Sequence, residues 1–343
     1  MRFALSPEHA DFGASVRKLL DAGHTPAAVR AWGAGDPRPG RALLRQAAGA
    51  GVTGLIIEEK YGGLGAEPID LVVAFVELGR AAAPGPIVET AAAIPALLQA
   101  LPDNSGARRW LPGFADGDAL GTIAFATPDR DTVALDADTA EVVLIAQGNR
   151  LSTAHHTGLI RSVDPARRLF AVAPDEVVAE GDQVPAAIAA AFDTGALACA
   201  AQLLGAGRAL LAAATEYAKQ RKQFGKPIGE FQAVKQKLAD VLIGLDLAEP
   251  LLHRAALTMG ESTRSRDVSA AVVACGDAAY LAARAALQVH GAIGYTAEYD
   301  LSLWLTKVTA LRSAWGTPDL HRARIARSLR DEAVRDRSLR GTA

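Results

Sequence analysis

The segment from Arg221 to Gly225 is the first place where the residue types suggest chemistry. It reads Arg-Lys-Gln-Phe-Gly and follows a stretch with helical periodicity. The guanidinium group of Arg221 presents a planar fork of N–H donors, which suits the oxygens of a phosphate. The same residues also have an ordinary explanation, because cations and glycine are both common at the C-terminal ends of helices.

A second candidate segment contains Gln288, His290, Gly291 and Gly294. Glycine allows the backbone to approach a phosphate closely. The alternative is a helix that ends at Gly291 and continues into a turn. His290 alone is a poor catalytic candidate, since a single histidine at a helix end is more often structural.

The elements that position these segments begin with an N-terminal helical region. Ser6 and Pro7 are typical of an N-cap followed by proline in the first helical position, and Gly23 is expected to end that helix. Two further helices are expected at about 68–82 and 88–101.

The region from about Gly121 to Val184 has a different pattern. Short β-rich runs alternate there with polar or turn-forming stretches, which predicts a small β domain. The expected strands lie at 122–126, 141–146, 158–163 and 169–173.

Helical periodicity returns after Phe192. Thr194 is expected to cap the first helix, and Pro250 is expected to kink or interrupt the second. The third helix is expected to end at His290, and the fourth begins at a clear cap, Thr317, followed by proline. Four long helices with short connections predict a four-helix bundle.

The predicted fold class is therefore α+β, mainly α. An N-terminal helical domain is expected over 1–118, a reduced β-strand domain over 119–190 and a C-terminal helical bundle over 191–343. The 343 residues, half of them hydrophobic, suffice for a sizeable core.

Composition also narrows the partners and the compartment. The net charge of −2 does not indicate nucleic acid or an anionic membrane. No apolar run is judged long enough to cross a bilayer, which takes about 20 residues, and no signal peptide is expected at the N-terminus. Cys199 and Cys275 do not look like a disulfide framework, so a cytoplasmic location is expected.

Three stretches resemble the acyl-CoA dehydrogenase family. They are Glu59–Ala81 (EKYGGLGAEPIDLVVAFVELGRA), Tyr217–Asp240 (YAKQRKQFGKPIGEFQAVKQKLAD) and Gln288–Tyr299 (QVHGAIGYTAEY), the last followed by Gly316–Ala326 (GTPDLHRARIA). They occur in the order of the family, and the helix–strand–helix layout agrees along nearly the whole chain. The resemblance therefore implies the acyl-CoA dehydrogenase fold.

The resemblance also implies FAD, an acyl-CoA substrate and a shared cofactor site. In the family a carboxylate removes the α-proton while the β-hydrogen leaves as hydride to the flavin, and each FAD is shared between two subunits. By resemblance, Arg221 would pair with the pyrophosphate of a neighbour's FAD, Phe224 would pack on the cofactor and Gln223 would form a hydrogen bond nearby. Gln288 and Gly291 would lie along the adenosine part of the same FAD.

The usual catalytic base is missing from its position. The family most often takes it from a Glu directly before a Gly-Thr pair, and here that residue is Trp315, whose indole cannot accept the proton. Trp315 is also expected to close this chain's own pocket. Some relatives place the base where this chain has Gly195 or Ala196. Asp193, two residues away, is the fallback base, although an Asp before a helix is more often a cap.

The loop that would hold the chain's own flavin is reduced as well. The family's TEPGAGSD-like strand and loop shrink to FATPDRD at 125–131, and no WITN-like segment follows. By this resemblance, the residues that would reach a neighbour's FAD are retained, whereas the segment that would hold this chain's own FAD is reduced.

This imbalance resembles the short β subunit of actinobacterial α2β2 heterotetrameric acyl-CoA dehydrogenases, several of which act on sterol side-chain CoA thioesters. The expected function is a non-catalytic subunit that completes the FAD site of a second, base-carrying acyl-CoA dehydrogenase subunit. Two alternatives stay open: a self-sufficient enzyme that uses Asp193, and a flavin-free scaffold on the same fold.

Overall fold

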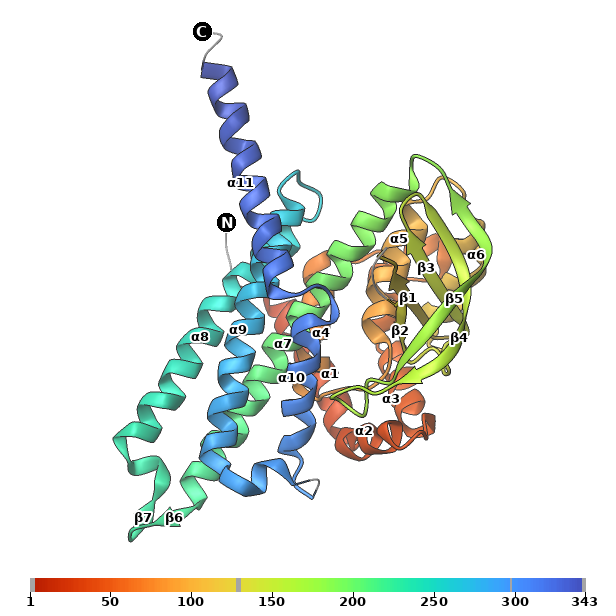
Figure 1. Cartoon of the computed structure of the whole chain (residues 1–343). Coiled ribbons are helices and arrows are strands. Elements are labelled where there is room, and N and C mark those ends of the chain that lie inside the picture. The colour runs from red at the N-terminus through yellow and green to blue at the C-terminus, as the bar shows by residue number, and fades with distance from the viewer. Residues whose placement is uncertain (1–3, 128–130, 297, 341–343) are drawn as a thin grey trace.

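The computed structural model describes residues 4–127, 131–296 and 298–340 (Figure 1). A helical N-terminal region and a five-stranded sheet lie on one side, and a long helix, α7, runs from them into a helical bundle. The helices before the sheet are α1 (Pro7–Ala22), α2 (Thr25–Gly33), α3 (Arg38–Gly49), α4 (Pro68–Arg80), α5 (Ile94–Ala100) and α6 (Ser105–Ala115). Short 3-10 turns lie at Val52–Gly54, Glu59–Tyr61, Ile228–Glu230 and Gly291–Tyr295.

Local signals predicted three of the N-terminal helices, α1, α4 and α5. The Ser6 hydroxyl oxygen accepts a hydrogen bond from the His9 backbone N–H at 3.3 Å, which confirms the predicted cap of α1. The helix expected at 68–82 is α4. The one expected at 88–101 consists of a π-helical turn, η3 (Glu89–Ala93), followed by α5.

The predicted β domain is a single sheet with strand order β1-β3-β4-β5-β2. Its strands are β1 (Gly121–Phe125), β2 (Val133–Leu135), β3 (Val142–Gln147), β4 (Arg150–Ile160) and β5 (Leu169–Glu180). Strands β1 and β3 are parallel, and the other pairs are antiparallel. Leu144 on β3 packs into the main core while Ile145 joins a second cluster on the opposite face, which explains why β3 is apolar from Val142 to Ala146.

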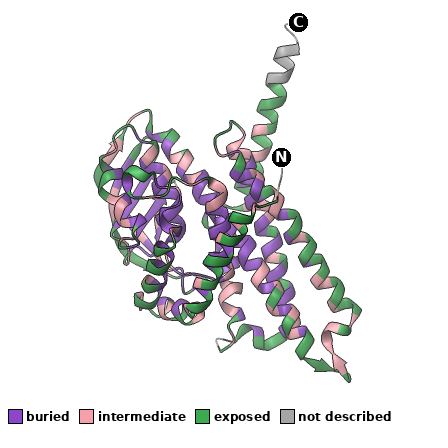
Figure 2. Ribbon diagram, turned by 180° about the vertical axis from the view of Figure 1, so that it is seen from behind, coloured by how far each residue is buried: buried purple, intermediate pink, exposed green. Residues whose placement is uncertain are grey.

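The predicted four-helix bundle is present, but with a different fourth member. The C-terminal helices are α7 (Val184–Gln220), α8 (Gln232–Leu257), α9 (Arg264–His290), α10 (Leu301–Ala314) and α11 (Pro318–Arg340). Helices α7 to α10 form the bundle, whereas α11 packs on α9 near its start and then projects away from the bundle (Figures 1 and 2).

Two expectations about the C-terminal helices were wrong. Helix α7 begins at Val184, so Thr194 lies inside the helix, where its hydroxyl donates to the Ala190 carbonyl at 2.9 Å instead of capping. Pro250 does not interrupt α8, which continues to Leu257. Tertiary packing of the two helices outweighs these local signals.

The expectation that no run could cross a bilayer also needs correction. Helices α7 and α9 are long and apolar enough by length and composition. Both are core helices, however, and pack against each other and against their neighbours (Figure 2). Glycines allow a close crossing of α4 on α7, since a Cβ at Gly79 would lie 2.1 Å from the Gln202 carbonyl oxygen. This crossing fixes the N-terminal region on the bundle.

Candidate functional site

Trp315, at the position of the usual base, lies at the C-terminal end of α10 and is buried. Its ring meets Phe125 of β1 edge-on at a centroid distance of 5.5 Å and approaches Phe192 of α7 at 6.2 Å. Its backbone carbonyl accepts a hydrogen bond from Nε2 of His321 at 2.8 Å. The indole is therefore clamped between the sheet and the bundle.

Gly195 lies directly against this indole. A Cβ at Gly195 would lie 2.3 Å from Cζ3 of Trp315, far inside contact distance. The two positions that the resemblance predicts for a base, one on α7 and one after α10, thus meet in space. In this chain they are a glycine and an indole.

Asp193 is buried within α7, and its carboxylate forms ion pairs with two arginines. One carboxylate oxygen is 2.6 Å from Nη2 of Arg324 on α11, and the other is 2.9 Å from Nε of Arg264 on α9. Asp193 therefore does not precede the helix, and its reading as a cap is wrong. Both oxygens accept hydrogen bonds from cations, so the carboxylate ties three helices together.

Trp315 lines a cavity of about 510 Å³ between the sheet, α7 and α10. The expectation that the indole closes this space was wrong, because the ring forms a wall of the cavity and does not fill it. The buried side chains of Glu89 and Arg167 also line it. Sequence analysis missed both residues, although a lone Glu within the apolar run at 86–98 was a signal.

Arg221, Gln223 and Phe224 lie on an exposed hairpin between α7 and α8. Strands β6 (Lys222–Gln223) and β7 (Lys226–Pro227) pair antiparallel across a two-residue turn, Phe224-Gly225, in which both residues have positive φ. Phe224 is 92% exposed, with its backbone in the strained left-handed region. Its ring meets that of Phe231 edge-on at a centroid distance of 6.2 Å, and strained backbone of this kind is common at functional sites.

Gln288 and Gly291 line a groove of about 900 Å³ along α9 and α10, together with the cations Lys237 and Arg284. The C-terminal end of α9, which leads into Gly291, and the hairpin lie at the same end of the bundle (Figure 1). The groove is also lined by the apolar side chain of Leu287 and by Gly294.

The ring of His290 contacts α7, the helix that leads into the hairpin, and the next residue, Gly291, lines the groove. The His290 ring stacks on Tyr217, near the end of α7, at a centroid distance of 4.3 Å, and its Nδ1 donates to the Ala286 carbonyl at 2.8 Å. Burial lowers the pKa of His290. These contacts support a structural role.

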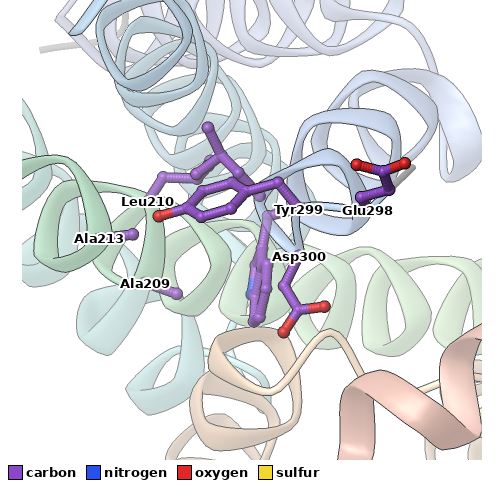
Figure 3. A pocket seen from close by; sticks show the side chains of 8 residues that line it. Ala209, Leu210, Ala213, Glu298, Tyr299 and Asp300 are labelled. Atoms are coloured by element: carbon purple, nitrogen blue, oxygen red, sulfur yellow. The ribbon is translucent and has the colours of Figure 1, made fainter. Parts of the chain in front are cut away.

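A smaller cavity of about 340 Å³ lies between α7 and α10 (Figure 3). The ring of Tyr299 lies across it toward Ala213, and the Asp300 side chain is at its edge. Asp300 is paired with Arg30 at 2.5 Å. Among residues 4–127, 131–296 and 298–340 no group of three His, Cys, Asp or Glu side chains could hold a metal ion.

Comparison with known proteins agrees with this layout. Residues 6–118 match the family description "Acyl-CoA dehydrogenase, N-terminal domain", and residues 185–330 match "Acyl-CoA dehydrogenase, C-terminal domain". The chain belongs to the acyl-CoA dehydrogenase family. The five-stranded sheet lies between the two matched ranges, as the resemblance implied.

Two similar acyl-CoA dehydrogenases span nearly the same length. The chain is 31% identical over 321 residues to acyl-CoA dehydrogenase IpdE2 of Mycolicibacterium smegmatis, covering 92% of this chain and 96% of that protein. It is 34% identical over 296 residues to IpdE2 of Mycobacterium tuberculosis, covering 85% and 88%.

Solved structures share the fold at low identity. The Tcur3481-Tcur3483 steroid ACAD has a TM-score of 0.81 at 22% identity, covering 95% of this chain and 99% of that chain. The ChsE4-ChsE5 complex from Mycobacterium tuberculosis has a TM-score of 0.79 at 22% identity, covering 96% and 99%. These likenesses confirm the predicted acyl-CoA dehydrogenase fold.

One part of the family motif stays a sequence prediction. In the reduced FATPDRD segment, residues 128–130 lie outside the described residues. Phe125, at its start, packs on Trp315 as part of the aromatic wall. Aromatic packing thus marks the end of β1 in this family member.

Proposed function

We propose that this chain is the non-catalytic subunit of a heteromeric, FAD-dependent acyl-CoA dehydrogenase. It would complete the FAD site of a partner subunit that carries the base. The observation that carries the proposal is the contact of Trp315 with Gly195, because both positions expected for a base lack a proton acceptor. The complex would work in the cytoplasm.

The exposed hairpin supports a flavin shared with the partner. Arg221 has no ion-pair partner among the residues that the structure describes, so its fork is available for a pyrophosphate. Phe224 would pack on the cofactor and shield it from water, and Gln223 would form a hydrogen bond beside it. Gln288 and Gly291 would hold the adenosine part in the groove of about 900 Å³. When bound, FAD accepts the hydride from the substrate.

An exposed apolar stripe on α8 supports assembly with a second subunit. Ile243, Leu247 and Leu251 recur at four-residue steps and are 55%, 69% and 39% exposed. Leu242 and Leu281 widen the apolar surface, at 49% and 44% exposed. Contiguous apolar surface of this kind is typical of protein interfaces. We propose an α2β2 heterotetramer.

The names of similar structures support the choice of substrate class. One solved structure with this fold is named a steroid ACAD, and another is a complex of two different chains. We propose α,β-desaturation of an acyl-CoA thioester, with a sterol side-chain CoA as the substrate class. The partner's pocket would select the acyl group.

The self-sufficient enzyme with Asp193 as base is the weaker candidate. A base needs a lone pair that faces the substrate. Both oxygens of Asp193 instead accept hydrogen bonds from Arg264 and Arg324. The flavin-free scaffold is separated from the leading proposal by flavin content alone.

One experiment tests these functions against each other. The chain is purified alone and also co-expressed with the acyl-CoA dehydrogenase subunit encoded beside it, and the visible spectrum is recorded for both. We expect flavin absorbance and acyl-CoA turnover only in the co-expressed complex. Yellow protein and turnover from the chain alone would refute the proposal, and a colourless complex would favour the scaffold.

A further inference from the structure

Two buried charged side chains, together with the exposed Arg161, line the cavity beside Trp315, and the flavin contacts do not use them. Glu89 comes from the π-helical turn η3, and Arg167 comes from the segment between β4 and β5. Glu89 is 4% exposed and Arg167 is 8% exposed. Burial of two ionisable groups on one cavity wall is costly unless something binds them.

Glu89 has a carboxyl oxygen without a partner. Its Oε2 is buried and accepts or donates no hydrogen bond among the residues that the structure describes. Burial raises the pKa of Glu89, which favours the protonated form that can donate a hydrogen bond. Single π-helical turns occur frequently at functional sites, and this one presents Glu89 to the cavity.

Arg167 supplies a positive charge that nearby carboxylates do not neutralise by direct contact. Its guanidinium has no hydrogen-bonded carboxylate in the described part of the chain. The nearby Asp136 accepts instead from Trp32 Nε1 at 2.9 Å, and Asp164 accepts from the Ala166 backbone at 3.0 Å. The planar fork of Arg167 is therefore available to a ligand with two coplanar oxygens.

The remaining wall is aromatic on one side and also includes Arg161 and the hydroxyl side chains of Ser162 and Ser313. Phe125, Phe192 and Trp315 enclose one side, with ring centroids 5.5 to 6.2 Å apart. We propose that this cavity binds a small apolar carboxylate, with its oxygens on Arg167, the Glu89 carboxyl group donating to one of them and its hydrocarbon body against the aromatic rings. The carboxylate belongs either to a free acid or to the far end of an acyl-CoA chain. This site does not depend on the flavin contacts, so either proposal can fail without the other.

Calorimetric titration of the full chain, in the complex if the chain requires it, tests the site with two ligand pairs. Hexanoate is compared with hexanamide, and adipyl-CoA is compared with hexanoyl-CoA. We expect the carboxylate member of at least one pair to bind about tenfold or more tightly than its neutral match. A preference in the first pair identifies a free acid, and a preference only in the second identifies an acyl-CoA. Equal affinity within both pairs overturns the proposal.

Variants assign any preference to the two residues. Arg167→Gln should abolish the preference, Arg167→Lys should retain part of it, and Glu89→Gln, which keeps a donor, should retain most of it. Arg168→Gln is the matched control, because its side chain pairs with Asp138 outside this cavity. An unchanged preference in folded Arg167→Gln would also overturn the proposal, and Arg167→Lys keeps the test decisive if the glutamine variant fails to fold.

Discussion

The indole of Trp315 lies directly against the Cα of Gly195, so that a single added carbon at position 195 would lie 2.3 Å from Cζ3 of the ring. The contact joins a residue in the first third of α7 to the residue that follows the last residue of α10. A side chain at position 195 therefore has no room beside the indole.

Gly195→Ala should destabilise the fold by about 1–3 kcal/mol, because the new methyl group overlaps the indole and the surrounding rings are packed. Chemical unfolding measures the change. Gly49→Ala is the matched control, since Gly49 is helical with nothing within 4 Å of a built Cβ and should be neutral or slightly stabilising. Equal effects at the two sites would contradict the packing described here.

Asp193→Asn should destabilise the chain by about 2–4 kcal/mol, because it leaves Arg264 and Arg324 without their buried counter-charge. Turnover of folded complex should be retained. A stable variant with abolished turnover would instead support Asp193 as the base. Unfolding and steady-state rates, measured on the same preparation, separate these outcomes.

Arg221→Ala should strip FAD from the complex, with an affinity loss of about tenfold or more, because a charge-assisted contact to phosphate is removed. Lys219→Ala is the control, since Lys219 lies at the same helix end but is paired with Glu216. Flavin content after gel filtration is the readout. Equal flavin in wild type and Arg221→Ala would show that the hairpin does not hold the pyrophosphate.

Deprotonation of the buried Asp136 should lower the free energy of unfolding as the pH rises from about 4 toward 7. Burial raises the pKa of Asp136 to about 7, above its ordinary value of 3.8. The folded state therefore holds a proton that the unfolded state releases, and the stability from this group is present below about pH 4 and lost as pH rises through 7.

Asp136→Asn isolates this effect. The amide oxygen can still accept from Trp32 Nε1, which is 2.9 Å from the carboxylate in the wild type. The stability of the variant relative to wild type should therefore increase steadily from pH 4 to pH 7 in urea unfolding. A difference that is constant across this range would show that Asp136 ionises normally in the folded state.

Capping residues and hydrophobic periodicity are local signals, and they predicted the helices and strands in which they are clear. The Thr317 hydroxyl accepts from the Leu320 backbone at 3.2 Å, as expected for the start of α11. The start of α7 was placed eleven residues too late, because Thr194 looked like a cap and the true N-cap, Gln183, makes no capping hydrogen bond with its side chain. Helices α6 and α10 and strand β2 were not separated, since their short patterns merge with neighbouring segments.

By itself, the sequence determined which residues occupy the hairpin motif and that no acid precedes Gly316, because both are facts of chain order. Only the tertiary structure decided that Asp193 meets arginines 71 and 131 residues away, and that Glu89 and Arg167 share a cavity with Trp315. Such contacts depend on how whole helices pack across the core, which periodicity and capping do not encode.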